Sequence, residues 1–116
     1  DIYKRVKTHF AKHGFSDIET KVLAAGEPCK APLEAEIVKV VSSAAKQVYG
    51  IEPSILPTIA GSGPMYIFSD ALSIPIVSGE GLTRVDSNIH APNESVRIDD
   101  YLNAVKHAAT IMATYV

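Results

Sequence analysis

Residues 54–78 read SILPTIAGSGPMYIFSDALSIPIVS, and the spacing of their apolar side chains changes twice. Residues 54–59 are typical of a short strand, because apolar and β-branched side chains dominate them. The sequence GSGP at residues 61–64 predicts a tight turn. Residues 65–72 predict a short helix, and residues 74–78 predict a second strand. A strand, a helix and a strand in this order predict a parallel crossover, which is right-handed in nearly all proteins.

Amphipathic helices flank this unit on both sides. The helix before it covers residues 33–48, with Pro32 suited to its first turn and Gly50 suited to the position after it. The helix after it covers residues 98–112. The apolar stripe of the first helix comprises Leu33, Ile37, Val40, Val41, Ala44 and Val48. We therefore expect an α/β fold in which helices flank a small, mostly parallel sheet.

The N-terminal residues predict a separate helix and strand. Ile2, Val6 and Phe10 recur at helical spacing, and Gly14 suits the end of that helix because it accepts a positive φ. Apolar and polar side chains then alternate over residues 17–25, which is the pattern of a half-exposed strand.

A proline-rich stretch separates the two parts of the chain. The sequence GEPCKAP at residues 26–32 contains two prolines and one glycine, which stop both helices and strands. We divide the chain into residues 1–26, a hinge at residues 27–32, and residues 33–116. Because a helical pattern is already running at Asp1, we expect the chain to be a piece of a longer protein.

The composition excludes several classes of protein. The chain has 116 residues, 47% of them hydrophobic, and a formal net charge of -2. Nucleic-acid binding is not expected, since it usually shows as a strongly basic face. No apolar run approaches the roughly 20 residues that span a bilayer, so we expect no membrane segment. Because Cys29 is the only cysteine, no internal disulfide forms, and we expect a reducing, cytoplasmic location.

Two polar loops are candidate sites, and the first is the glycine turn at residues 61–64. Backbone N–H groups at the start of a helix attract carboxylates and phosphates. The alternative is a plain turn in which Ser62 caps the helix. No lysine follows the glycines, which excludes a P-loop. Ala60 and Pro64 stand where a nucleophile elbow requires glycines, so that motif is absent as well.

The second loop, residues 86–94, has the sequence DSNIHAPNE. It brings two carboxylates, one imidazole and two amides into nine residues. If the backbone is extended, Asp86, Asn88 and His90 share one face. From the residues alone, His90 is a metal ligand, a general base or a hydrogen-bonded loop histidine.

The remaining histidines and the cysteine give weaker signals. His9 and His13 lie four residues apart on the first predicted helix, a spacing that can bind a metal, but no third ligand is near them. We interpret His107 as a surface or boundary residue of the last helix. Cys29 lies beside Lys30, and we interpret it as a linker cysteine rather than a reactive thiol.

Four motifs together resemble one family of zinc hydrolases in order and spacing. The family comprises the zinc aminoacylases and carboxypeptidases, with acetylornithine deacetylase, succinyl-diaminopimelate desuccinylase, glutamate carboxypeptidase and the carnosine dipeptidases. Residues 2–26 resemble the last helix and strand of its lid, or dimerisation, domain. The four motifs are GSGPM at 61–65, GEG at 79–81, NIHAPNE at 88–94 and DDYL at 99–102.

The resemblance implies the C-terminal part of a catalytic domain that holds two zinc ions and hydrolyses amide bonds next to a free carboxylate. It implies that His90 is a zinc ligand. It places Ser62 and Gly63 near the substrate carboxylate, and it gives Asn93 and Glu94 the role of holding the His90 loop. The substrate would be a small peptide or an N-acyl amino acid. The implied partner is a second copy of the chain, paired through residues 17–25 of the lid.

The chain departs from the family in one way that matters for activity. The family takes its other zinc ligands from an H-x-D motif, an Asp and a Glu-Glu pair, and neither H-x-D nor Glu-Glu occurs here. Because a zinc site needs three or four protein ligands, we expect no catalytic residue in this chain and no activity from it alone. Zinc in this fragment is expected to bind weakly or not at all.

Two other functions stay open from the sequence. The first is a non-catalytic α/β module for dimerisation or binding. The second is a serine hydrolase that uses Ser62 and His90, which the missing elbow motif disfavours. Zinc titration of the full-length protein, or the finding of an H-x-D motif upstream in the parent gene, would distinguish the non-catalytic module from a metal-dependent hydrolase.

Overall fold

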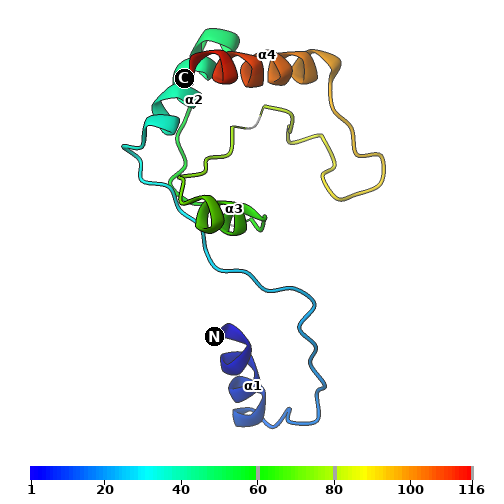
Figure 1. The fold of residues 1–116 in the computed structure, drawn as a ribbon. Helices are drawn as coiled ribbons and strands as arrows, with labels where there is room; N and C mark the ends of the chain where they lie inside the picture. The colour runs from blue at the N-terminus through cyan, green and yellow to red at the C-terminus, as the bar shows by residue number, and fades with distance from the viewer. Residues whose placement is uncertain (60, 80, 116) are drawn as a thin grey trace.

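The computed structural model describes residues 1–59, 61–79 and 81–115. Four helices and no strand are found in these residues (Figure 1). None of these helices is long and apolar enough to cross a bilayer. The helices are α1 (Ile2–Lys12), α2 (Glu36–Tyr49), α3 (Met65–Leu72) and α4 (Ile98–Thr114).

The predicted helices are confirmed, and local caps explain where α1 begins and ends. The Asp1 side chain caps α1 by accepting a hydrogen bond of 3.2 Å from the Lys4 N–H. At the other end Gly14 has φ +81°. The Phe15 N–H donates to the Phe10 carbonyl at 2.9 Å, which is the backbone pattern of a Schellman motif. Glycine permits this turn because it has no Cβ to clash at positive φ.

Helix α2 ends as predicted but begins later. Gly50 closes it in the left-handed conformation with φ 73°. Pro32 does not lie in the first turn. Its carbonyl instead accepts the Ala35 N–H at 3.1 Å, which makes a separate turn before the helix begins at Glu36.

The predicted α/β fold is wrong for the described chain. Residues 17–25, 54–59 and 74–78 were expected to be strands, and none of them is one. A strand exists only where its backbone groups pair with a neighbouring strand. Within the described residues, residues 19–31 and 51–59 take part in no backbone–backbone hydrogen bond. The segments carry the composition of strands but do not pair with one another.

Helices α2 and α4 are the one pair of described helices in contact, and a buried histidine joins them. His107 is 2% exposed, which corrects its interpretation as a surface or boundary residue. Its Nε2 lies 3.1 Å from the Val41 carbonyl oxygen, and because a carbonyl only accepts, Nε2 carries the proton. The Tyr49 ring meets the imidazole edge-on, with centroids 5.7 Å apart.

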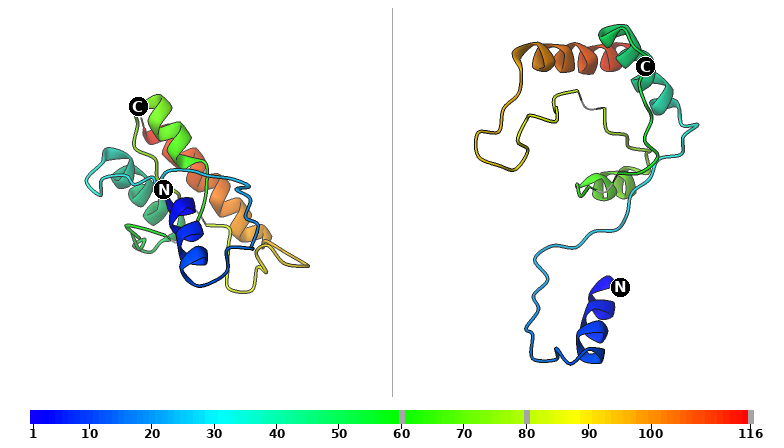
Figure 2. Two further views of the ribbon diagram at one scale, coloured as in Figure 1. Left: turned by 90° about the horizontal axis from the view of Figure 1, so that it is seen from below. Right: turned by 180° about the vertical axis from the view of Figure 1, so that it is seen from behind.

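The chain is far from compact. Its radius of gyration is 18.9 Å, against about 13 Å for a compact chain of this length. Its accessible surface is 9770 Å², against about 6,100 Å² for a compact protein of this mass. Figures 1 and 2 show α1 standing apart at the end of a long segment without helix. Within the described residues, the buried hydrophobic side chains are Val38, Ala44 and Ala45.

We expect His107→Ala to loosen the α2–α4 pair. The substitution leaves a cavity and removes a donor from the Val41 carbonyl, so the free energy of unfolding should fall by roughly 1–3 kcal/mol. Urea titration followed by far-UV circular dichroism measures this change. The exposed neighbour substitution Lys106→Ala is the control, and equal midpoints for the two variants would contradict the role of His107.

Candidate metal-ligand loop

Two glycines dock the chain before the His90 loop onto the α2–α4 pair. A Cβ at Gly79 would lie 3.1 Å from Val41 Cγ1 and 3.4 Å from His107 Cε1. A Cβ at Gly81 would overlap the Tyr49 hydroxyl. A side chain at Gly79 would require Val41 and His107 to shift by a few tenths of an ångström, and one at Gly81 would require the Tyr49 side chain to move. The two glycines of the GEG motif are thereby explained by a close backbone approach.

The His90 loop itself is closed by backbone hydrogen bonds. The Ser95 N–H donates to the Ser87 carbonyl at 3.0 Å, which brings the two ends of the loop together. The Ala91 N–H donates to the Asn88 carbonyl at 2.9 Å, which forms a turn around His90. The two ends of the loop are therefore held together, and the residues between them, including His90, project from this closed base.

Three residues of this loop adopt left-handed backbone conformations. Asn88, His90 and Asn93 have φ of 52°, 59° and 61°. Asparagine tolerates this region because its short polar side chain bonds locally, whereas the conformation costs more for other residues with a Cβ. The asparagines on either side of the H-A-P sequence therefore suit the two turns that present His90.

The base of the loop depends on residues that the sequence analysis did not assign. Ser87 is 5% exposed, and its Oγ accepts the Arg84 N–H at 3.0 Å. Arg84 Nε lies 3.4 Å from Asp86 Oδ1, and its Nη1 lies 3.7 Å from Asp100 Oδ2 at the start of α4. No sequence signal identifies this arrangement, because Arg84 meets Asp100 only when the loop and α4 take up their positions.

The imidazole of His90 is placed where a ligand can reach it. The residue is exposed, and within the described chain its ring takes part in no hydrogen bond or ion pair. An exposed imidazole at a loop tip fits one coordination position of a zinc ion. The described residues contain no group of three or more His, Cys, Asp or Glu side chains that could hold a metal ion. The described residues fit one ligand of a zinc site and do not supply the remainder.

Asn93 and Glu94 are also exposed. Their side chains make no hydrogen bond or ion pair with the described residues, so their role in holding the loop stays a prediction.

The glycine turn before α3 is a second exposed loop. Helix α3 begins at Met65 with Pro64 as its N-cap residue and no side-chain cap, so the alternative in which Ser62 caps this helix is wrong. The N–H groups of Ser62 and Gly63 donate no backbone hydrogen bond within the described chain. They are available to an anion, as the predicted carboxylate site requires. No described hydrogen bond links Ser62 to His90, so the serine-hydrolase alternative gains no support.

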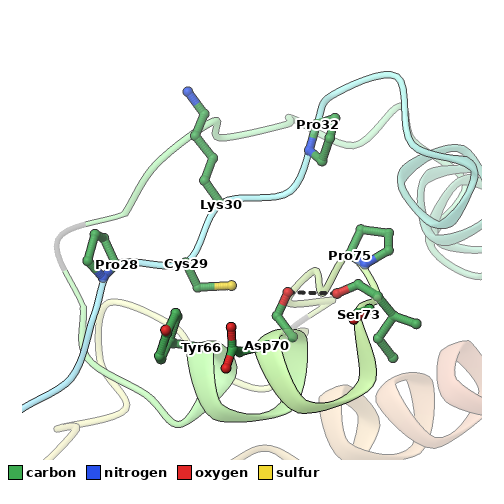
Figure 3. Close-up of a pocket in the computed structure, with 10 residues that line it drawn as sticks. Pro28, Cys29, Lys30, Pro32, Tyr66, Asp70, Ser73 and Pro75 are labelled. Atoms are coloured by element: carbon green, nitrogen blue, oxygen red, sulfur yellow. Dashed lines mark hydrogen bonds between the residues drawn. The ribbon is translucent and has the colours of Figure 1, made fainter.

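A shallow cleft lies between the hinge and α3 (Figure 3). Its volume is about 490 Å³, and it contains none of the predicted site residues. The Lys30 side chain points away from α3, whereas Tyr66 and Asp70 face the hinge. At the end of α3, the Ser69 hydroxyl donates to the Ile74 carbonyl at 2.7 Å. The cleft is lined by Pro28, Cys29, Lys30, Pro32, Tyr66, Ser69, Asp70, Ser73, Ile74 and Pro75.

Within the described residues, the two histidines of α1 gain no third metal ligand. The rings of His9 and His13 have centroids 4.3 Å apart, and no third ligand joins them within the described residues. Two imidazoles alone fall short of the three or four protein ligands of a zinc site.

Comparison with known proteins gives two matches. The sequence model of peptidase family M20/M25/M40 matches residues 5–114. The crystal structure of an M20 family metallo-carboxypeptidase from Sulfolobus solfataricus matches 98% of this chain at 37% identity, with a TM-score of 0.78. This chain covers 26% of that protein, so it spans about a quarter of its length. A search of curated proteins found no match.

We expect the isolated chain to bind zinc more weakly than about 1 µM, because it offers one suitable ligand where a site needs three or four. Isothermal titration calorimetry measures the affinity, with His9→Ala as a control that removes the α1 histidine pair. A sub-micromolar dissociation constant that survives in His9→Ala would show that the chain holds a complete ligand set.

Proposed function

The chain belongs to peptidase family M20/M25/M40, and we propose that it forms the C-terminal part of a metal-dependent hydrolase of amide bonds. The observation that carries the proposal is the exposed imidazole of His90 at the tip of a closed loop, in a chain that matches the family over residues 5–114. The match to about a quarter of a metallo-carboxypeptidase supports the view that the other ligands lie elsewhere in a longer parent protein.

In this proposal His90 contributes one ligand to a centre of two zinc ions. The ions, when bound, supply a water activated for attack on a carbonyl carbon. The chain's own contribution is to hold an imidazole at a fixed position and, through Asn93 and Glu94, to stabilise its loop. No general acid or base of the reaction lies in this chain, so the fragment alone is inactive.

The free N–H groups of Ser62 and Gly63 suggest the class of substrate. Helix α3 begins directly after this turn, at Met65, and unpaired backbone N–H groups beside a helix start favour a carboxylate. A carboxypeptidase acts at a chain end that bears a free carboxylate, and the similar solved protein is described as one. We therefore propose a small peptide or an N-acyl amino acid with a free carboxylate as the substrate.

The division of the chain follows the same proposal. Residues 1–26 belong to a lid or dimerisation domain, residues 27–32 are the hinge, and residues 33–116 belong to the catalytic domain. The separation of α1 from the other helices supports a boundary near the hinge (Figure 1).

His90→Ala in the parent protein should abolish activity while leaving the fold intact. Losing an outer partner of a metal ligand costs about 10–100-fold, and losing the ligand itself should cost more in kcat/KM. Steady-state kinetics with a zinc-loaded enzyme measures the loss, and circular dichroism verifies the fold. His9→Ala, which removes an exposed histidine of α1, is the matched control. Near wild-type turnover in His90→Ala would end the ligand assignment and favour a non-catalytic module.

We further propose that residues 17–25 join two copies of the parent protein. The backbone of residues 19–25 has no backbone partner in the described chain, and Val22 and Leu23 are 50% and 87% exposed. Unpaired backbone beside exposed apolar side chains invites pairing with a second chain.

Val22→Pro should convert such a dimer to a monomer, because proline removes one backbone donor from the paired segment. Sedimentation velocity of the parent protein measures the change. Glu27→Pro, which lies outside the segment and beside a natural proline, is the control. A parent protein that is monomeric as wild type, or a Val22→Pro variant that remains a dimer, would contradict the proposal.

A further inference from the structure

The three left-handed residues of the His90 loop need an external constraint. Backbone of this kind persists only when surrounding contacts over-determine it. Asparagine and histidine adopt this region more often than most residues, but left-handed backbone still costs free energy at each of the three positions. The hydrogen bonds that close the loop fix its shape, and Gly79 and Gly81 dock the chain before it, but neither holds the base of the loop to α4. A separate contact does so.

The guanidinium of Arg84 makes that contact. It lies 3.4 Å from Asp86 at the start of the loop and 3.7 Å from Asp100 in the first turn of α4. The Asp100 side chain is 26% exposed, and its Oδ2 is buried without a hydrogen bond from the described residues. Arg84 therefore supplies the one described ionic partner of a carboxylate that has lost most of its water.

Arg84 also connects to the loop through its backbone. Its N–H donates to Ser87 Oγ, and its carbonyl accepts the Ser87 N–H at 3.1 Å. Ser87 in turn accepts the N–H that closes the loop. Arg84 thus contacts the loop through its backbone and α4 through its side chain.

We propose that Arg84 is a positioning residue, which sets where the His90 imidazole lies by tying the loop base to Asp100 of α4. The inference rests on the proposed function, in which His90 is a zinc ligand. Arg84 itself touches neither metal nor substrate. Helix α4 is held by its contact with α2, so Arg84 attaches the loop to the one packed helix pair of the described chain.

The test measures zinc affinity of the zinc-free parent protein by competition with a chromophoric chelator. Arg84→Met removes the charge and keeps most of the side-chain volume. Asp100→Asn removes the opposite charge and keeps the side-chain shape, so it carries the test if Arg84→Met fails to fold. Each should weaken zinc binding by up to about 10-fold, the low end of the loss for groups that contact a metal ligand directly, because Arg84 acts on His90 only through the loop. The double variant should be no weaker than either single one, because both break the same tie.

Two controls separate positioning from stability. Arg97→Met removes an exposed arginine at the start of α4 and should bind zinc like the wild type. Arg84→Lys keeps the charge and should recover part of the affinity. A role in folding alone would lower the midpoint of thermal unfolding but leave zinc affinity unchanged in the folded protein, and that result would overturn the inference.

His90→Ala in the same assay distinguishes the two failures. If His90→Ala loses zinc while Arg84→Met and Asp100→Asn match Arg97→Met, the positioning role is wrong and the proposed function stands. If His90→Ala binds zinc like the wild type, the ligand assignment is wrong and the positioning role falls with it.

Discussion

The hydrogen bond from the buried His107 imidazole to the Val41 carbonyl is the interaction on which the described structure depends. It joins α2 to α4, the one pair of described helices that pack together. A donor buried to this extent stabilises only when its partner is held in place, because an unsatisfied buried polar group costs about 1–3 kcal/mol. Gly79 docks against the same two side chains, so the contact also fixes the chain that leads into the His90 loop.

The segment before the His90 loop is attached to this helix pair in two ways. Gly79 and Gly81 pack against the two helices, and Arg84 ties the base of the loop to Asp100 of α4. The loop that follows has no helix or strand of its own, yet its ends are joined by a backbone hydrogen bond. A ligand that must lie within tenths of an ångström of its metal needs such support, since a loop without it would sample many positions.

Many large apolar side chains of the described chain are exposed to solvent. Large hydrophobic side chains such as Val6, Leu56, Phe68 and Met112 are exposed. Each Å² of apolar surface removed from water stabilises a protein by about 25 cal/mol, so covering these side chains would be favourable. The proposal of a longer parent protein, paired through residues 17–25, accounts for what would cover them.

Local features were predictable from the sequence, and contacts between distant residues were not. The helices follow from apolar spacing, and the ends of α1 and α2 follow from Gly14 and Gly50, because caps act within a few residues. The sheet was predicted wrongly, because the strand composition of residues 54–59 carries no information about whether a partner strand is present. His107 lies between Lys106 and Ala108 and gives no sign of burial, which arises from its contact with a residue 66 positions away.

The candidate site, too, was predictable from the sequence only in part. The content of the loop and the choice of His90 came from the sequence and its motifs. The tie from Arg84 to Asp100 did not, because the two residues meet only when α4 and the loop take up their positions. The left-handed backbone at His90 was not predicted either, because most histidines lie outside this region even though histidine adopts it more often than most residues.

The assignment of His90 as a zinc ligand can be checked by anomalous X-ray diffraction at the zinc absorption edge, from crystals of the zinc-loaded parent protein. We expect an anomalous peak about 2.0–2.1 Å from a ring nitrogen of His90, with the other ligands coming from outside residues 1–116. A zinc peak whose ligands exclude His90, with the imidazole turned away from it, would contradict this assignment.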